Sequence, residues 1–413
     1  MVEIEFGALR RVDPEMAGLV DREHERTVSS LSLIASETLS IPAVREAVAG
    51  DLADKYAEGY PGTRYHGGCG VVDEIENLAT LRARELFGAE HANVQSHSGT
   101  SANLAVHAAF AQPGDPVMAL KLAHGGHQTH GSRANYSGRW FHPLGYGLRQ
   151  DTETLDYDAI RDMARIHRPR ILVAGASSYS RLIDYTVLRS IADEVDCVLW
   201  VDAAHIAGLV AAQVVPSPVS IADVVSGATH KVLRGPRGGF LLSRADHSVA
   251  VDKAVYPFSQ GGPALNVIAA KAVAFADAAT TEFRTYARRA VDNCGALSAA
   301  LAGRGLRSVS GGSDTHLVVI DVTELGISGA EAQRRLEHAR IVCDRAALPF
   351  DSRPPGQGSG IRVGTAVATA RGLLPEHMEA LAELMVAAMR ALPENPESAR
   401  VAGDVRDLLA SVR

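Results

Sequence analysis

Short apolar runs alternate with helical stretches through the central part of this 413-residue chain. Between about residues 94 and 243 the runs are Val117 to Leu122, Ile171 to Ala176, Val198 to Val201, Val224-Val225 and Phe240 to Leu242. Strands that are apolar at every position are typical of sheets that helices cover on both faces. The alternation therefore predicts an α/β fold with a mainly parallel sheet, in which ligands gather at the carboxyl ends of the strands.

One lysine, Lys231, lies in a polar, glycine-rich loop between Ser226 and Gly239. A lysine amine condenses with an aldehyde only when it is neutral, and a confined site favours the neutral form. Upstream, Asp202 directly follows the run Cys197 to Val201, so we expect its side chain to point from a strand end into a cleft. A lysine for the aldehyde and a carboxylate for the ring nitrogen are the pair that pyridoxal phosphate (PLP) requires.

A third segment, His97 to Asn103, reads His-Ser-Gly-Thr-Ser-Ala-Asn and opens an alanine-rich helical stretch. Backbone N–H groups and hydroxyls at the start of a helix are well suited to bind a phosphate group. A phosphate-binding segment, an acid and a lysine therefore follow one another along the chain. Together they indicate a PLP site much more specifically than any one of them does.

Composition excludes several other classes of protein. A net charge of −7 without a basic stripe argues against nucleic acid and anionic membrane as partners, and no apolar run approaches the length of a membrane span. We therefore expect a small-molecule partner. The four cysteines, Cys69, Cys197, Cys294 and Cys343, form no CxxC pair, so we predict no metal site, no disulfide framework and a cytoplasmic location.

The chain is expected to divide into three parts: an N-terminal helical arm over residues 1–40, a large PLP-binding α/β domain over 41–280 and a smaller C-terminal α+β domain over 281–413. The helical periodicity of Val267 to Ala290 predicts the crossing between the two domains. In the smaller domain we expect a strand at Leu317 to Val322 and an amphipathic helix at His377 to Leu392.

Eight sequence blocks extend the pattern over about residues 31 to 392. They are Leu33 to Glu37, Lys55 to Gly62, Leu122 to His127, Val201 to Leu209, Thr229 to Lys231, Gly235 to Gly239, Gln260 to Pro263 and Ser359 to Thr365. In this order the blocks resemble the serine hydroxymethyltransferase family, whose members are fold-type I PLP enzymes with an aspartate aminotransferase-like large domain. The resemblance implies reversible Cα–Cβ cleavage of serine, or of an α-substituted serine, with transfer of the one-carbon unit to tetrahydrofolate.

The same resemblance implies roles for residues around the cofactor. Lys231 would carry PLP as a Schiff base, Asp202 would pair with the ring nitrogen, and His127 would stack on the ring face. The other implied cofactor-binding residues are His205 and Ser177 at the phenolic oxygen, Ser98, Gly99 and Thr100 at the phosphate, His230 beside the lysine, and Tyr56 and Gly262 from a neighbouring subunit. The active unit would then be a homodimer or tetramer with shared active sites.

On the substrate side, the resemblance implies that Arg362, assisted by Ser36, binds the substrate carboxylate in a bidentate pair. Glu58 matches the family's acid/base carboxylate, which lies near both the substrate hydroxyl and the folate. Tyr65 and His66 complete the implied substrate contacts, and His66 joins Lys231, Glu58, His127 and Asp202 as a catalytic candidate. The implied folate contacts are Glu58, Tyr65, Leu122 and Gly126.

Three departures from the family pattern fall at substrate-facing positions. His66 replaces a tyrosine, Ala228 replaces a threonine, and Ala346 replaces an asparagine that hydrogen-bonds the pterin. The changes at His66 and Ala228 would free space beside the substrate Cα. Besides an ordinary family member, they leave open a 2-methylserine-specific hydroxymethyltransferase, a folate-independent β-hydroxy-amino-acid aldolase or transaldolase, and a non-catalytic PLP-fold scaffold.

Overall fold

The computed structural model describes residues 7–393 and 395–412. Its strands are β1 (Leu31–Ser32), β2 (His91–Asn93), β3 (Pro116–Leu120), β4 (His142–Tyr146), β5 (Ile171–Ala174), β6 (Val198–Asp202), β7 (Val224–Ala228), β8 (Gly239–Ser243), β9 (Leu317–Asp321), β10 (Ile341–Val342), β11 (Asp344–Ala346) and β12 (Gly360–Gly364). Its α-helices are α1 (Gly7–Val12), α2 (Pro14–Ser29), α3 (Pro42–Val48), α4 (Gly70–Phe87), α5 (Gly99–Phe110), α6 (Tyr136–Trp140), α7 (Tyr157–His167), α8 (Tyr185–Val195), α9 (Ala207–Ala211), α10 (Ser248–Lys253), α11 (Leu265–Ala278), α12 (Thr281–Ala302), α13 (Gly329–His338), α14 (Ala366–Ala370), α15 (Met378–Arg390) and α16 (Pro396–Ser411).

The main sheet has seven strands in the order β2-β8-β7-β6-β5-β3-β4. The five strands from β7 to β4 pair in parallel, whereas β8 is antiparallel to both of its neighbours. The predicted α/β fold with a mainly parallel sheet is confirmed. The apolar-run pattern did not find β2, which has three residues, or β4, whose sequence His-Pro-Leu-Gly-Tyr has no apolar run.

Successive residues of each central strand pack on opposite faces of this sheet, because side chains alternate along a strand. In β6, Leu199 and Val201 join the hydrophobic core on one face, and Trp200 joins the core on the face that α5 covers. Both faces are therefore buried, which explains the uninterrupted apolar runs. The alternation also directs Asp202, two residues after Trp200, toward the α5 face.

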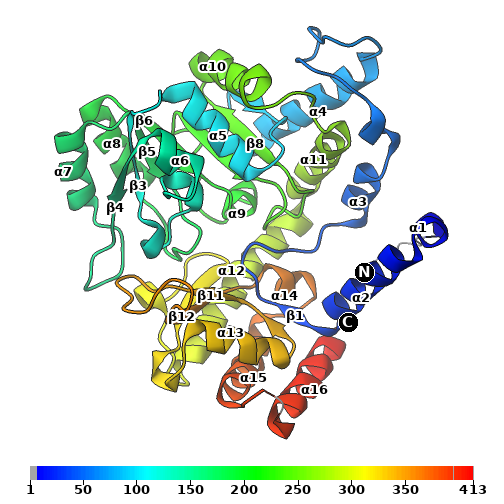
Figure 1. The fold of residues 1–413 in the computed structure, drawn as a ribbon, viewed down its shortest axis with the longest axis vertical. Coiled ribbons are helices and arrows are strands. Elements are labelled where there is room, and N and C mark those ends of the chain that lie inside the picture. The colour runs from blue at the N-terminus through cyan, green and yellow to red at the C-terminus, as the bar shows by residue number, and fades with distance from the viewer. Residues whose placement is uncertain (1–6, 394, 413) are drawn as a thin grey trace.

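A second core lies below the main sheet in the view of Figure 1. It is built on the antiparallel sheet β11-β12-β9 and on helices α12, α13, α15 and α16. The predicted strand at Leu317 to Val322 and helix at His377 to Leu392 correspond to β9 and α15. The domain boundaries at residues 40/41 and 280/281 stay predictions.

The helical stretch expected at Val267 to Ala290 is two helices. Helix α11 ends at Ala278, and α12 begins after Thr280, whose side chain accepts a hydrogen bond from the Phe283 N–H at 3.2 Å as an N-cap. Capping of this kind lets a new helix start in a new direction without unpaired N–H groups. It is α12 that runs from the first core into the second.

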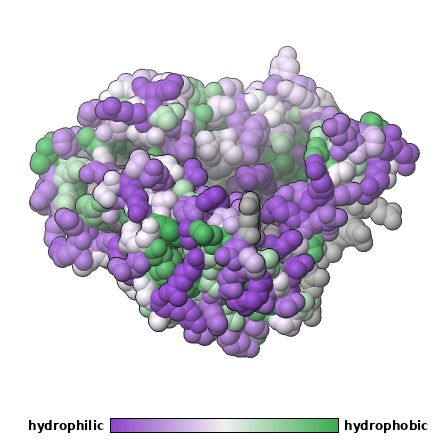
Figure 2. Space-filling view, turned by 60° about the horizontal axis from the view of Figure 1, so that its bottom comes forward, coloured by the Kyte–Doolittle hydropathy of each residue, from purple (hydrophilic) through white to green (hydrophobic). Residues whose placement is uncertain are grey.

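Of the segment predicted as a helical arm over residues 1–40, the described part is helical in α1 and α2 but not after Ser29. After α2 the chain forms β1, which pairs in parallel with β10, so that Leu31 and Leu33 are buried in the second core. Among the described residues no helix is both long and apolar enough to cross a membrane. The face shown in Figure 2 is mostly hydrophilic, and its hydrophobic residues gather in small areas.

Candidate active site

The Lys231 cavity, of about 160 Å³, lies at the carboxyl ends of the parallel strands. Fourteen residues line it: Ser98, Gly99, Thr100, Asn103, His127, Ala176, Ser177, Asp202, Ala204, His205, Ala228, His230, Lys231 and Arg237. The structure thus brings together nine of the eleven residues expected to bind the cofactor. Tyr56 and Gly262, which were expected from a neighbouring subunit, are absent from this set of lining residues.

Lys231 follows β7 in a loop whose two ends are joined by hydrogen bonds from Thr229. The Thr229 N–H donates to the Gly238 carbonyl at 3.0 Å, and the Thr229 hydroxyl donates to the Pro236 carbonyl at 2.6 Å. Burial, with the positive charges of Arg362 and Arg237, lowers the pKa of Lys231 to about 8, although Asp202 opposes the shift. A substantial fraction of the amine is therefore neutral near physiological pH, as condensation with an aldehyde requires.

Asp202 ends β6 with its carboxylate held by three donors. Asn103 Nδ2 donates to Oδ2 at 2.8 Å, His130 Nε2 lies 2.9 Å from the same oxygen, and the Ala204 N–H donates to Oδ1 at 3.0 Å. Burial alone would raise the pKa of Asp202, but the hydrogen bond and charge of His130, together with the Ala204 N–H, outweigh it and hold the pKa well below its usual range. Asp202 therefore stays ionised and fixed in the cavity.

Asn103 and His130 were not recognised as functional from the sequence. Asn103 is buried on α5, where its Oδ1 accepts from Ser226 Oγ at 2.7 Å, and Ser226 Oγ in turn accepts from Trp200 Nε1 at 2.9 Å. This chain of polar groups links α5, β7 and β6 beneath Asp202. An asparagine and a serine inside otherwise apolar elements are the sequence signal that could have found it, because buried polar side chains need partners.

His127 lies in the cavity wall with its Nδ1 2.8 Å from Thr129 Oγ1. Burial lowers its pKa to about 4, so the imidazole is neutral at physiological pH and suits stacking on a flat ring. His127, His130 and Asp202 also lie close enough together to hold a metal ion. In the structure their nitrogen and oxygen atoms hydrogen-bond to one another and to Thr129. The absence of a metal site stays a prediction.

The cavity ends at the N-terminus of α5. Ser98 caps this helix by accepting from the Ser101 N–H at 3.0 Å. The other N–H groups at the start of a helix have no partner within it, so they are suited to bind an anion. Gly239 allows β8 to approach closely, because a Cβ there would lie 2.2 Å from the Ser98 carbonyl oxygen. Beneath this junction the buried Lys271 ammonium donates to the carbonyls of Val94, Ser96 and Gly239 at 2.6–2.9 Å.

The residues present fit PLP. The buried Nδ1 atoms of His205 and His230, both in residues that line the cavity, have no hydrogen-bond partner among the described residues. Such unpaired polar atoms are costly unless a ligand or water pairs with them. Lys231 would hold the aldehyde carbon, Asp202 the ring nitrogen and the first turn of α5 the phosphate.

Arg362 lies on β12 beside the Lys231 cavity. Its Nη1 donates to the carbonyl of Ser177, a cavity-lining residue, at 2.6 Å. Its Nε and Nη2 donate to Asp344 Oδ2 at 3.2 and 2.5 Å. The guanidinium is therefore held rigidly where its charge reaches Lys231, whose pKa it lowers.

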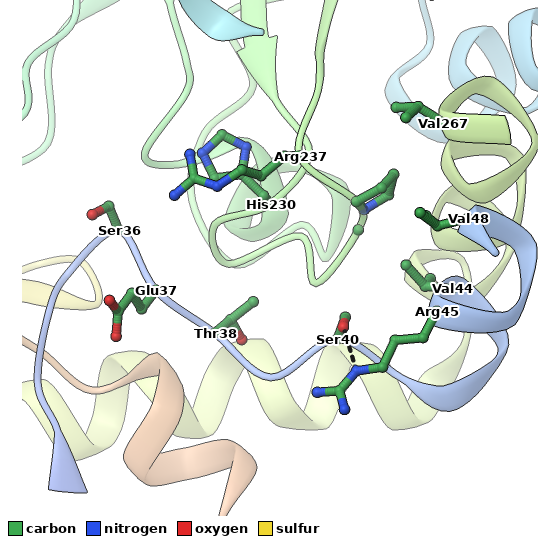
Figure 3. Close-up of a pocket in the computed structure, with 12 residues that line it drawn as sticks. Ser36, Glu37, Thr38, Ser40, Val44, Arg45, Val48, His230, Arg237 and Val267 are labelled. Atoms are coloured by element: carbon green, nitrogen blue, oxygen red, sulfur yellow. Dashed lines mark hydrogen bonds between the residues drawn. The ribbon is translucent and has the colours of Figure 1, made fainter. Parts of the chain in front are cut away.

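A second cavity, of about 440 Å³, adjoins the first through His230 and Arg237 (Figure 3). Ser36, expected to contact the substrate carboxylate, lies in the extended segment along its rim. Helices α3 and α11 form the opposite wall with Val44, Val48 and Val267.

Four of the predicted site residues form a separate group, which we call the Glu58 cluster: Tyr56, Glu58, Tyr65 and His66. The Glu58 N–H donates to His66 Nδ1 at 3.4 Å, and the His66 ring meets those of Tyr56 and Tyr65 edge-on at 4.9 and 5.3 Å. A Cβ on Gly262 would touch the Tyr56 ring at 3.2 Å. Tyr65 is 83% exposed and Tyr56 59% exposed, so the cluster lies open on the surface of the single chain.

Arg64 holds the segment that carries the Glu58 cluster. Its buried guanidinium donates to Glu76 at 2.5 Å, to Asp73 at 2.8 Å and to the carbonyls of Ala57 and Gly59. Replacing Arg64 by methionine is expected to lower the free energy of unfolding by about 3–5 kcal/mol, because it leaves buried Glu76 without its partner.

Urea unfolding of the Arg64→Met variant measures this loss. Arg165→Met is the control, since Arg165 pairs with Glu194 at an exposed site where ion pairs contribute little. Equal stability of the Arg64 variant and the unmodified protein would contradict the assigned role.

Two of the four predicted folate contacts, Leu122 and Gly126, lie near Arg362, whereas Glu58 and Tyr65 belong to the Glu58 cluster. Leu122 lines a third cavity, of about 430 Å³, together with Arg362, Asp344 and Ala346. The Gly126 carbonyl accepts from Ser177 Oγ at 2.8 Å, which ties this region to the Lys231 cavity. Ala346 offers no side-chain hydrogen-bonding group where the family pattern has asparagine.

The position of Lys231 decides the class of protein. Enzymes of PLP fold-type I hold their cofactor at the carboxyl end of a mainly parallel sheet, where this chain has its lysine and acid. A family model described as serine hydroxymethyltransferase matches residues 9–385, and the chain belongs to that family. Members of the family are transferases that use PLP as cofactor and tetrahydrofolate as co-substrate.

Two relatives have similar sequences over nearly their whole length. The chain is 51% identical to serine hydroxymethyltransferase 1 of Pseudomonas fluorescens (strain Pf0-1) over 365 aligned residues. The aligned region is 88% of this chain and 89% of the relative. The chain is 48% identical over 401 residues to serine hydroxymethyltransferase of Acidobacterium capsulatum, covering 97% and 94%. These similarities favour the ordinary family activity over the specialised alternatives that His66, Ala228 and Ala346 left open.

Proposed function

We propose that this chain catalyses the reversible transfer of the serine hydroxymethyl group to tetrahydrofolate. The observation that carries the proposal is the placement of Lys231 and the ionised Asp202 in one buried cavity beside Arg362. When bound there, PLP accepts the electron pair that Cα–Cβ cleavage leaves on the amino acid. The products are glycine and a one-carbon unit on the folate.

The chain's own residues orient the reaction. Arg362 would bind the substrate carboxylate with Ser36 nearby, and a fixed guanidinium sets which bond of the amino acid stands over the cofactor ring. The neutral His127 would pack on that ring, and Asp202 would keep a proton on the ring nitrogen. Glu58 would hold or move the proton of the substrate hydroxyl.

The Glu58 cluster implies that the active unit is a homodimer or tetramer. The cluster is open on the single chain, and the second cavity, of about 440 Å³, shares His230 and Arg237 with the Lys231 cavity. A partner would then bring Tyr56, Gly262 and Glu58 to this Lys231. The Leu122 side of the third cavity would take the folate, with Tyr65 and Gly126.

Mixing two inactive variants tests the shared site. Lys231→Ala and Tyr56→Ala each remove one of the two residues that a shared active site needs. When the two variants are refolded together, each mixed dimer has one site with both residues intact, and activity is expected to return at that site. If mixtures stay as inactive as the separate variants, each chain completes its own site and the proposal is wrong.

A four-arm assay tests the substrate. Purified holo-protein is given L-serine or 2-methylserine, each with and without tetrahydrofolate, and amino-acid products are measured. Folate-dependent formation of glycine from serine is expected to dominate. Faster conversion of 2-methylserine to alanine, or turnover indifferent to folate, would contradict the proposal.

The lowered pKa of Lys231 gives a pH dependence for cofactor capture. The neutral fraction of an amine with a pKa of about 8 rises about tenfold between pH 7 and pH 9 and then levels off. The rate at which cofactor-free protein binds PLP, followed by absorbance, is expected to follow this curve. A rate that still rises steeply above pH 10, as for an ordinary lysine, would be evidence against the assignment.

All four cysteines are free and buried, which is compatible with the predicted cytoplasmic location. That location stays a prediction, as does the choice between dimer and tetramer.

A further inference from the structure

Asp344 and Arg362 form an ion pair that the strand register builds into the small sheet. The two residues are direct cross-strand partners in the antiparallel pair β11–β12. Both Nε and Nη2 of Arg362 donate to one oxygen of Asp344, at 3.2 and 2.5 Å. Neighbouring side chains on paired strands interact closely, so this contact is a fixed feature of the sheet.

Asp344 uses only some of the N–H donors of the Arg362 guanidinium. An arginine has five N–H donors, of which Asp344 takes two and the Ser177 carbonyl takes one. The two remaining donors, one on Nη1 and one on Nη2, are available to a second carboxylate. The ion pair therefore does not block Arg362 but limits the donors that a substrate can use.

The charge of Asp344 opposes the binding of that substrate. A carboxylate bound to the remaining donors of Arg362 would lie close to the carboxylate of Asp344, and like charges on one guanidinium weaken each other's binding. Among the described residues no other ion pair neutralises Asp344: the neighbouring Arg345 donates to Gln333 Oε1 at 3.4 Å. The side chains of Arg362 and Asp344 are 14% and 32% exposed, so solvent screens the repulsion only in part.

We propose that Asp344 is a positioning and specificity-determining residue, which orients Arg362 and keeps the affinity of the site for amino-acid carboxylates low. The inference rests on the proposed function of Arg362 as the carboxylate-binding residue. Tighter substrate binding would not by itself speed turnover, since binding that stabilises the ground state as much as the transition state does not raise kcat.

The test compares two ligands that differ by the carboxylate. Dissociation constants of glycine and of methylamine are measured on holo-protein from the change in cofactor absorbance. Asp344→Asn keeps an oxygen that accepts from Arg362 but removes the charge. It is expected to bind glycine about 3- to 10-fold more tightly, as electrostatic relief at a partly buried pair allows, with methylamine unchanged. The KM for serine is expected to fall without a rise in kcat.

Two further variants make the outcome decisive. Asp321→Asn removes a carboxylate from another ion pair of the same sheet, with Arg307, and is expected to leave glycine binding unchanged. Asp344→Ser also removes the charge and leaves the bond between Arg362 and the Ser177 carbonyl in place. It replaces Asp344→Asn if that variant does not fold, and it is likewise expected to bind glycine more tightly. Glycine binding that is unchanged or weaker in the neutral Asp344 variants would overturn the inference.

Arg362→Lys separates this inference from the proposed function. If Arg362→Lys loses the preference for glycine over methylamine while the Asp344 variants behave like the unmodified protein, Arg362 binds the carboxylate and only the role of Asp344 is wrong. If Arg362→Lys keeps that preference, the proposed role of Arg362 itself fails.

Discussion

Replacing Lys231 by alanine is expected to abolish turnover of serine, with a loss of about 10³-fold or more, as for other residues that form covalent intermediates. Lys231 is the only lysine among the described residues that line the cavity. It is partly buried there, and its lowered pKa suits reaction with an aldehyde. Without the amine, the cofactor is held by weaker contacts alone.

Two measurements on the Lys231→Ala variant check this expectation. The absorbance band of lysine-bound PLP is expected to disappear, and borohydride reduction of the unmodified protein is expected to fix the cofactor on the peptide that contains Lys231. Lys253→Ala, at the exposed end of α10, serves as the control and should keep both activity and absorbance. A Lys231→Ala protein that keeps the band would show that another lysine holds the cofactor.

The second large effect is expected for Asp202→Asn, which keeps the size of the side chain and removes its charge. The pKa of Asp202 is held well below its usual range, so the carboxylate is ionised at neutral pH. An amide cannot keep a proton on the ring nitrogen, so kcat is expected to fall about 10²- to 10⁴-fold, as when other buried orienting carboxylates are neutralised.

The kcat of Asp202→Asn is measured together with its thermal unfolding midpoint. His130→Gln, which removes one of the donors to the carboxylate, is expected to reduce kcat less than Asp202→Asn does. If Asp202→Asn keeps kcat within a few-fold at full cofactor occupancy, the carboxylate does not act on the ring nitrogen.

The central sheet and the main residues of its site could be predicted from the sequence for one physical reason. Strands buried on both faces are apolar throughout, so the exception at the end of such a run, Asp202, stands out. The loop of Lys231 is equally visible, since its polar and glycine residues interrupt apolar strands. Nine of the expected cofactor residues accordingly line one cavity.

The partners of these residues could not be predicted in the same way. Asn103 contacts Asp202 across 99 positions of sequence, and His130 across 72, so only the folded chain brings them together. The pairing of Asp344 with Arg362 depends on the register of β11, a strand of three residues without an apolar pattern. The break between α11 and α12 depends on the cap at Thr280, which periodicity does not show.

The most direct test of the central claim is to follow the β-carbon of serine. Holo-protein is given serine labelled with ¹³C at that carbon, together with tetrahydrofolate, and glycine and labelled folate are quantified. One labelled methylene group on folate for each glycine formed is the predicted result. Glycine without labelled folate, or no glycine from a protein that carries PLP on Lys231, would contradict the account.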